Sequence, residues 1–168
     1  MEHDRILVFE PHPDDLCFQV AGSVRKWIAA GAQVFVCTVT TGNNSTFDPA
    51  VSSEEIKETM AREHRRALDI IGLPRSNLFA WDYDDLGLDT GRHRLPLLRD
   101  MVGLIRRVRP ATVVTMDPKN APNDENSDHV LVARVSFEAA ALSPHPHLFP
   151  EQFEDPGAAH HFVSRILF

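Results

Sequence analysis

The chain has 168 residues, with 17 basic and 24 acidic side chains and a formal net charge of -7 at pH 7. Its length suits one domain, and 43% hydrophobic and 24% charged residues exclude intrinsic disorder and collagen-like repeats. The acidic balance argues against nucleic acid as a partner, because phosphate binding requires a basic surface.

Strand-like and helix-like segments alternate along the chain. Apolar β-branched runs predict strands, and amphipathic segments between them predict helices. In chain order these are a strand over 5–10, a helix over 16–30, a strand over 33–40, a helix over 53–71, a strand over 77–81, a helix over 95–108, a strand over 111–116, a helix over 128–142 and a strand over 161–168. This order predicts an α/β fold with a Rossmann-like, doubly wound, mostly parallel sheet and helices on both faces.

The helix ends carry recognisable signals. Ser53 is expected to be the N-cap of the second helix and Gly72 its stop, and Pro110 follows the third helix. We expect a single domain over residues 1–168. The last apolar strand ends without a turn, which is compatible with a missing C-terminal part or with pairing to another segment. A homo-oligomer is also compatible with the sequence.

Polar side chains gather in the loops that follow the predicted strands. In open α/β sheets, ligands bind at the carboxyl ends of the strands, so these loops should share one rim. They contribute His12, Asp14 and Asp15, then Asn43 and Asn44, then Asp82, Asp84 and Asp85, and finally Asp117, Asp124, Asn126, Asp128 and His129. The sequence therefore predicts a site at this rim, where we expect Asn44 to face a substrate.

The sharpest motif is the turn over residues 11–15, which reads PHPDD. His12 and Asp15 can reach one ion, and His129 at the start of a later helix can supply a second imidazole. Two histidines and one carboxylate leave an open position, which is typical of catalytic zinc, although other divalent metals accept the same ligands. Asp14 would then accept a proton from a water whose pKa the ion lowers toward ~7. In the alternative interpretation, Asp14 and Asp15 only cap the helix and His12 is a loop histidine.

Three motifs together resemble a known family. The PHPDD turn after a strand, the TTG turn over residues 40–42 and the NSDH sequence over residues 126–129 are similar to those of the PIG-L (LmbE-like) deacetylases. The resemblance covers about residues 5–143. It implies a zinc-dependent hydrolase that removes the acetyl group from an N-acetylglucosamine-type sugar or a conjugate carrying one.

The resemblance also implies roles for the site residues. It makes His12, Asp15 and His129 the zinc ligands and Asp14 the general base. Asp85 matches a family position that faces the substrate, and Asp128 matches a carboxylate that orients a site histidine. Asn126 stands where relatives often carry a histidine. Asparagine can donate a hydrogen bond to an oxyanion but cannot deliver a proton. Two candidates for the general acid therefore stay open: Asp14, once it is protonated, and one of the late histidines.

Other classes of function are disfavoured or stay open. The chain has no G-x-G-x-x-G after its first strand, no P-loop motif and no G-x-S-x-G, which disfavours dinucleotide binding, NTP hydrolysis and serine hydrolysis. A metal-binding relative without turnover, with a structural or sensing role, and a hydrolase of non-sugar amides both remain alternatives. Two cysteines, no secretory start and no apolar run of ~20 residues predict a cytoplasmic protein without a membrane span.

Overall fold

The structure, a computed structural model, describes residues 4–88, 91–119 and 126–168. Its elements in chain order are β1 (Arg5–Glu10), α1 (Asp15–Gln19), α2 (Ala21–Ala29), β2 (Gln33–Thr40), α3 (Ser53–Ile71), η1 (Arg75–Asn77), β3 (Leu78–Tyr83), α4 (Arg94–Val108), β4 (Thr112–Val114), α5 (Ser127–Leu142), η3 (Pro150–Glu154) and β5 (Arg165–Leu167). The strands form one sheet in the order β3-β2-β1-β4-β5, and each neighbouring pair in this described sheet is parallel. The predicted fold class is confirmed.

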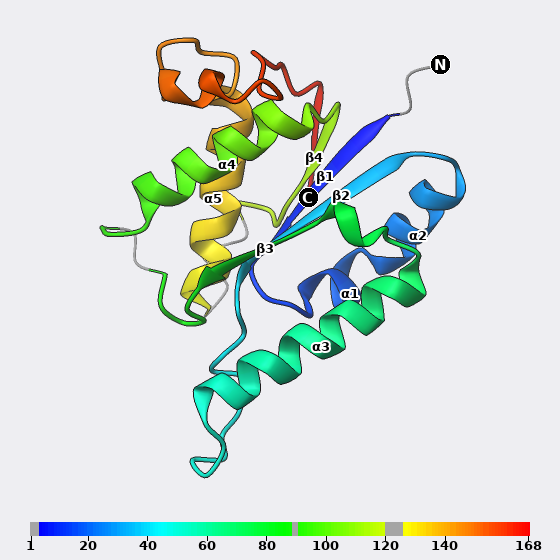
Figure 1. Cartoon of the computed structure of the whole chain (residues 1–168), viewed down its shortest axis with the longest axis vertical. Coiled ribbons are helices and arrows are strands. Elements are labelled where there is room, and N and C mark those ends of the chain that lie inside the picture. The colour runs from blue at the N-terminus through cyan, green and yellow to red at the C-terminus, as the bar shows by residue number, and fades with distance from the viewer. Residues whose placement is uncertain (1–3, 89–90, 120–125) are drawn as a thin grey trace.

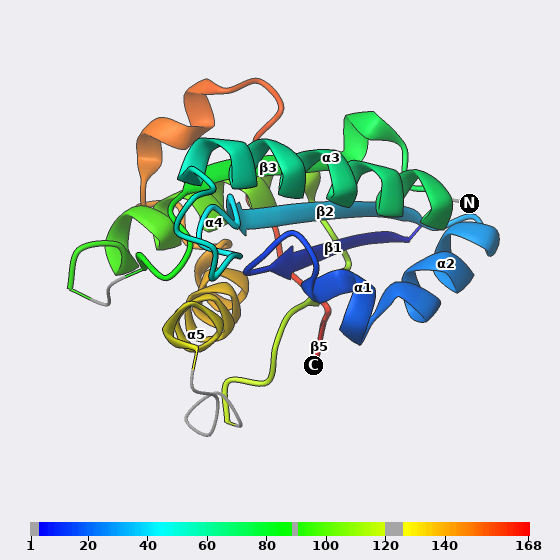
Figure 2. The ribbon, with the colours of Figure 1, turned by 90° about the horizontal axis from the view of Figure 1, so that it is seen from below.

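Helices cover both faces of the sheet (Figure 1, Figure 2). The first three helices, α1 to α3, lie on one face, and α4 and α5 lie on the other. The alternation of side chains along β1 explains this arrangement, because successive residues of a strand point to opposite faces. Ile6 and Val8 belong to the core under α1 to α3, whereas Leu7 and Phe9 belong to the core under α4 and α5.

One predicted helix is divided in two. The segment expected to be helical over 16–30 forms α1 and α2, which are separated at Val20. Val20 has a φ of -133° and a ψ of 6°, and β-branched residues are less suited to a continuous helix than straight-chain ones. After this break, Val24 of α2 is completely buried against the sheet.

The ends of the other helices agree with the sequence signals, with one correction. The N-cap of α3 is Ser52 and not Ser53, because the Ser52 hydroxyl accepts the Glu55 N–H at 3.2 Å. Gly72 ends α3 with a φ of 92°, as expected.

The strands β4 and β5 are shorter than predicted. Within the described residues, none of the helices has the length and apolar character needed to cross a membrane.

The sheet order places a switch point between β1 and β4. The chain leaves β1 toward helices on one face and leaves β4 toward α5 on the other face. In open α/β sheets, ligands bind at such a point, outside the carboxyl ends of the strands. The loops that follow β1 and β4 are therefore the ones that position a site.

Candidate metal centre

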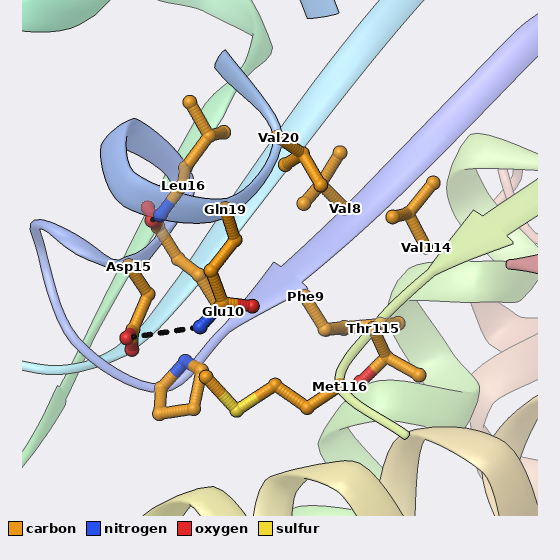
Figure 3. A pocket seen from close by; sticks show the side chains of 11 residues that line it. Val8, Phe9, Glu10, Asp15, Leu16, Gln19, Val20, Val114, Thr115 and Met116 are labelled. Carbon is orange, nitrogen blue, oxygen red and sulfur yellow. Dashed lines mark hydrogen bonds between the residues drawn. The ribbon is translucent and has the colours of Figure 1, made fainter. Parts of the chain in front are cut away.

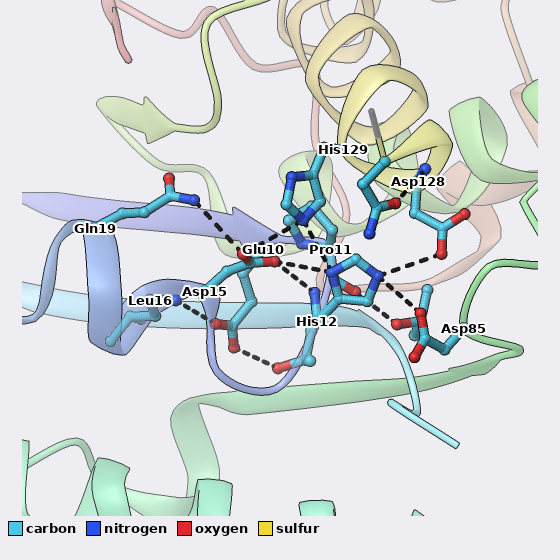
Figure 4. A network of polar contacts seen from close by, with 12 residues as sticks. Glu10, Pro11, His12, Asp15, Leu16, Gln19, Asp85, Asp128 and His129 are labelled. Carbon is cyan, nitrogen blue, oxygen red and sulfur yellow. Dashed lines mark hydrogen bonds and ion pairs between the residues drawn. The ribbon is translucent and has the colours of Figure 1, made fainter. Parts of the chain in front are cut away.

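Three side chains meet at the carboxyl end of the sheet (Figure 4). His12 and Asp15 follow β1, and His129 lies in the first turn of α5. Nδ1 of His12 lies 3.2 Å from Oδ2 of Asp15 and 3.1 Å from Nε2 of His129. Nε2 of His129 lies 3.5 Å from Oδ1 of Asp15. The structure therefore brings the three predicted ligands together from both sides of the switch point.

The dimensions of this cluster fit a tetrahedral ion. Metal bonds of about 2.0–2.1 Å place neighbouring ligand atoms about 3.3–3.4 Å apart in a tetrahedron. The separation of the two imidazole nitrogens and the distance from each of them to its nearer Asp15 oxygen fall on either side of that value. The His12 and Asp15 side chains are 9% and 12% exposed, and that of His129 is 18% exposed. Two imidazoles and one carboxylate could thus hold a metal while one side stays accessible to water and substrate.

Backbone hydrogen bonds shape the PHPDD turn over residues 11–15. The N–H of His12 donates to Oδ2 of Asp15 at 2.9 Å, and the N–H of Asp15 donates to the carbonyl of His12 at 3.3 Å. The carbonyl of Pro11 accepts both the N–H and the hydroxyl of Thr40, each at 2.9 Å. The start of the turn is therefore anchored to β2, and its two candidate ligands are fixed relative to each other.

The turn after β2 packs closely against the PHPDD turn. Gly42 has a φ of +67°, in the left-handed region that glycine adopts without strain. A Cβ at this position would lie 3.2 Å from Cδ of Pro13 and 3.2 Å from Cγ of Met60. Only glycine fits here without displacing the PHPDD turn or α3, which explains the glycine of the TTG sequence.

Two further carboxylates contact the other ring nitrogen of His12. Its Nε2 lies 3.0 Å from Oδ1 of Asp85 and 3.3 Å from Oδ2 of Asp128. Asp128 is fully buried and also accepts the N–H groups of Leu86, at 2.7 Å, and Leu88, at 3.2 Å. Carboxylates in such positions fix the tautomer and orientation of a metal-binding histidine. These contacts are what the predicted orienting role of Asp128 requires.

The surrounding carboxylates control the charge of His12. Burial lowers the pKa of His12, but its contacts with Asp128, Asp15 and Asp85 outweigh burial and raise the pKa to about 11. Burial also raises the pKa of Asp85, but the contact with His12 outweighs it and lowers that pKa below its usual value. A site that favours a cationic imidazole so strongly has a negative potential that also attracts a divalent cation.

Two asparagines hold the loop that carries Asp85. Oδ1 of Asn43 accepts the N–H of Asp85 at 2.8 Å, and Nδ2 of Asn44 donates to the carbonyl of Asp85 at 2.5 Å. The sequence places Asn43 at the predicted rim but indicates no specific contact for it, because a contact between two loops about 40 residues apart leaves no local signal. Asn44 thus has a partner within the protein, and its predicted contact with substrate stays a prediction, as does that of Asp85.

The remaining predicted residues border the cluster. Asp14 is exposed, and within the described residues its side chain makes no capping hydrogen bond to α1. Oδ2 of Asp15 accepts the His12 N–H, so simple helix capping does not account for the two aspartates.

Asn126 caps α5, because its Oδ1 accepts the Asp128 N–H at 2.9 Å. An asparagine directly before a predicted helix is a recognisable signal of such a cap. The chemical roles of Asp14 and Asn126 stay predictions, and Asp124 lies outside the described residues.

A pocket lies beside the cluster at the switch point (Figure 3). It is a small pocket between the end of β1, helix α1 and the segment after β4. Its polar lining includes Asp15 and Gln19, whose amide donates to Oδ1 of Asp15 at 3.5 Å. Glu10, at the end of β1, also lines it. Glu10 received no role from the sequence, although a carboxylate that ends an apolar strand is an identifiable signal.

Fold and site together define a Rossmann-type α/β protein with a His/Asp cluster that could hold a metal at its switch point. The model of the family described as "PIG-L: GlcNAc-PI de-N-acetylase" matches residues 7–140. The chain belongs to this family.

Individual relatives agree with this assignment. The diacetylchitobiose deacetylase of Thermococcus kodakarensis is 29% identical over 142 residues, covering 84% of this chain and 51% of the relative. The 1D-myo-inositol 2-acetamido-2-deoxy-alpha-D-glucopyranoside deacetylase of Rhodococcus jostii is 29% identical over 173 residues, covering 87% and 57%. The chain therefore spans about half the length of these curated relatives.

A solved structure shows the same fold. The N,N'-diacetylchitobiose deacetylase of Pyrococcus horikoshii matches with a TM-score of 0.89 and 23% sequence identity. The match covers 98% of this chain and 60% of that chain. The sheet and helices described above are therefore shared with this solved structure, and the agreement in shape does not depend on the sequence motifs.

Proposed function

We propose that this chain carries the metal site of a deacetylase that hydrolyses the acetamide of an N-acetylglucosamine-type sugar or sugar conjugate. The observation that carries the proposal is the meeting of His12, Asp15 and His129 within 3.5 Å at the switch point. Membership of the family and the names of the two curated relatives support the acetamido-sugar class of substrate. Zinc is the metal that the two imidazoles and one carboxylate favour.

Each residue of the site has a distinct chemical task in this proposal. A zinc ion, when bound, supplies a Lewis acid and lowers the pKa of a coordinated water toward ~7. Asp14, exposed beside the cluster, accepts the proton of the attacking water and later returns it to the leaving amine. Nδ2 of Asn126 is the donor that would stabilise the oxyanion on the acetyl carbon. The products are acetate and the free amine of the sugar.

The test is the variant Asp14→Ala, measured for zinc content and for acetate release from N,N'-diacetylchitobiose and N-acetylglucosamine derivatives. Asp14 is not one of the three clustered side chains, so we expect unchanged zinc binding. Loss of a general base should lower kcat/KM by about 10²–10⁴-fold. The matched control is Asp69→Ala, because Asp69 is an exposed aspartate on α3 that pairs with Arg75.

Two results would contradict parts of this proposal. Acetate release by Asp14→Ala at the rate of the wild type would overturn the assignment of the base. Zinc binding without acetate release from any acetamido sugar would favour the alternative of a metal-binding relative without turnover, or a non-sugar amide as substrate.

A further inference from the structure

A second polar cluster lies next to the PHPDD turn and is not used by the proposed chemistry. It consists of Glu10 at the end of β1, Thr38 of β2 and His64 of α3, whose exposed fractions are 2%, 2% and 6%. A buried carboxylate is costly unless its oxygens have partners. The partners of Glu10 therefore indicate why the core contains it.

The first oxygen of Glu10 holds the end of the PHPDD turn. Oε2 accepts the N–H of Leu16 at 2.9 Å (Figure 4). Leu16 directly follows the candidate ligand Asp15, and N–H groups in the first turn of a helix have no partner within that helix. The Thr40 contacts anchor the start of the turn at Pro11, so Glu10 provides the matching anchor at the other end.

The second oxygen of Glu10 connects this anchor to the layer of helices. Oε1 accepts the hydroxyl of Thr38 at 2.7 Å and lies 2.8 Å from Nε2 of His64. Within the described residues, Nε2 of His64 has no aligned hydrogen bond, so it is in close polar contact with Glu10 without a hydrogen bond between them. The position of the Glu10 carboxylate therefore depends on β2 and on α3.

We infer that Glu10, Thr38 and His64 form a positioning cluster that holds Asp15 in place for metal binding. This inference rests on the proposed function. Because one carboxylate joins the backbone beside Asp15 to two other elements, a change at His64 or Thr38 should reach the metal centre without altering any ligand. A purely structural cluster would affect the stability of the fold but not the affinity for the metal.

The experiment measures the zinc dissociation constant of the metal-free whole chain by competition with a chromophoric chelator. The variants Thr38→Val and His64→Leu each remove one partner of Oε1 and leave Glu10 in place. We expect each to weaken zinc binding about tenfold, the lower end of the effect of residues that orient metal ligands. His64→Gln keeps a polar N–H group that can reach Oε1, so it should bind zinc nearly as the wild type does.

A matched control removes a buried polar contact on the other face of the sheet. The hydroxyls of Ser136 and Thr115 lie 2.6 Å apart, and both residues are buried. Ser136→Ala should lower the melting temperature and leave zinc binding unchanged. Thr38→Val is almost isosteric, so it decides the question if His64→Leu does not fold.

Unchanged zinc affinity in Thr38→Val and His64→Leu, with only the melting temperature lowered, would overturn the inference and leave the proposed function intact. A wild-type protein that binds no zinc would overturn both. The two failures are therefore distinguishable in one set of measurements.

Discussion

His12 joins the two halves of the site through its two ring nitrogens. Nδ1 faces Asp15 and His129, whereas Nε2 faces Asp85 and Asp128. In the proposed site, the first pair binds the metal together with His12, and the second pair is placed to hold the imidazole ring with a proton on Nε2. A second group of side chains that could hold a metal consists of His12, Asp85 and Asp128. In the proposed site, these two carboxylates orient His12 instead of binding a second ion.

Zinc binding should depend on pH through His12. The pKa of His12 is raised to about 11. In the metal-free protein, both nitrogens of the His12 ring are therefore protonated at pH 7. A metal at Nδ1 displaces one of these protons, so binding should release about one proton and weaken about tenfold for each unit of decreasing pH between pH 9 and 7. Calorimetry in buffers of different ionisation enthalpy measures the release. Zinc binding without proton release over this range would contradict the protonated state of His12.

The buried carboxylate of Asp128 has a predicted role that can be separated from folding. Asp128→Asn keeps the shape of the side chain, but its single oxygen can accept the N–H of Leu86 or that of Leu88 and not both. It also removes the negative charge beside Nε2 of His12. We expect zinc affinity to fall about 10–100-fold, as for other partners of metal-binding histidines. Glu138→Gln is the control, because Glu138 lies on the same helix in an exposed pair with Arg94. Equal zinc affinity in the two variants would show that Asp128 does not orient His12.

Asn126 combines a measurable cap with a predicted catalytic contact, and substitutions can separate the two. Asn126→Ala should destabilise the fold by about 1 kcal/mol through loss of the α5 cap. Asn126→Ser keeps a capping oxygen and removes the amide, so its stability should be close to that of the wild type while acetate release falls. Thermal unfolding and acetate assays measure the two effects. Full activity in Asn126→Ser would exclude the amide as the oxyanion donor.

Among the elements, the turn after β2 controls the position of the PHPDD turn through one glycine. Gly42→Ala places a Cβ against Pro13 and Met60 at a positive φ, which costs about 1–2 kcal/mol for the backbone conformation alone. Zinc affinity should fall as well, because the Cβ pushes on the turn that carries His12. Chemical denaturation and zinc titration measure the two losses.

Gly22 provides the control for this element. It lies within α2, and a Cβ there would have no atom within 4 Å. Gly22→Ala should stabilise the protein by up to about 1 kcal/mol, because alanine favours a helix more than glycine does. A similar loss in both variants would mean that the crowding at Gly42 is not the cause.

The elements also show how far the sequence could predict the structure. Apolar β-branched runs locate the strands, and helix stops locate the ends of α3 and α4, because these signals are local. The division at Val20 has no local signal in the sequence, because the apolar stripe continues across it. Similarly, Ser53 was expected to be the cap of α3, but two neighbouring serines compete and only the fold selects Ser52.

At the scale of the whole molecule, the sheet order turns sequence motifs into a site. The PHPDD turn and His129 are separated by more than 110 residues, and they meet because β1 and β4 are neighbours. The rim of polar loops was predictable from the strand–helix alternation alone. The contacts of Asn43 with Asp85 and of Glu10 with His64 were not, since they depend on side-chain packing between loops and layers.

The most direct test of the account is the zinc content of the purified chain, measured by elemental analysis beside the double variant His12→Ala, His129→Ala. We predict about one zinc ion per chain in the wild type after removal of loosely bound metal, as expected for a site with these ligands. The double variant should retain none. A wild type that holds no zinc after the metal is supplied, or a double variant with the same content as the wild type, would contradict the account.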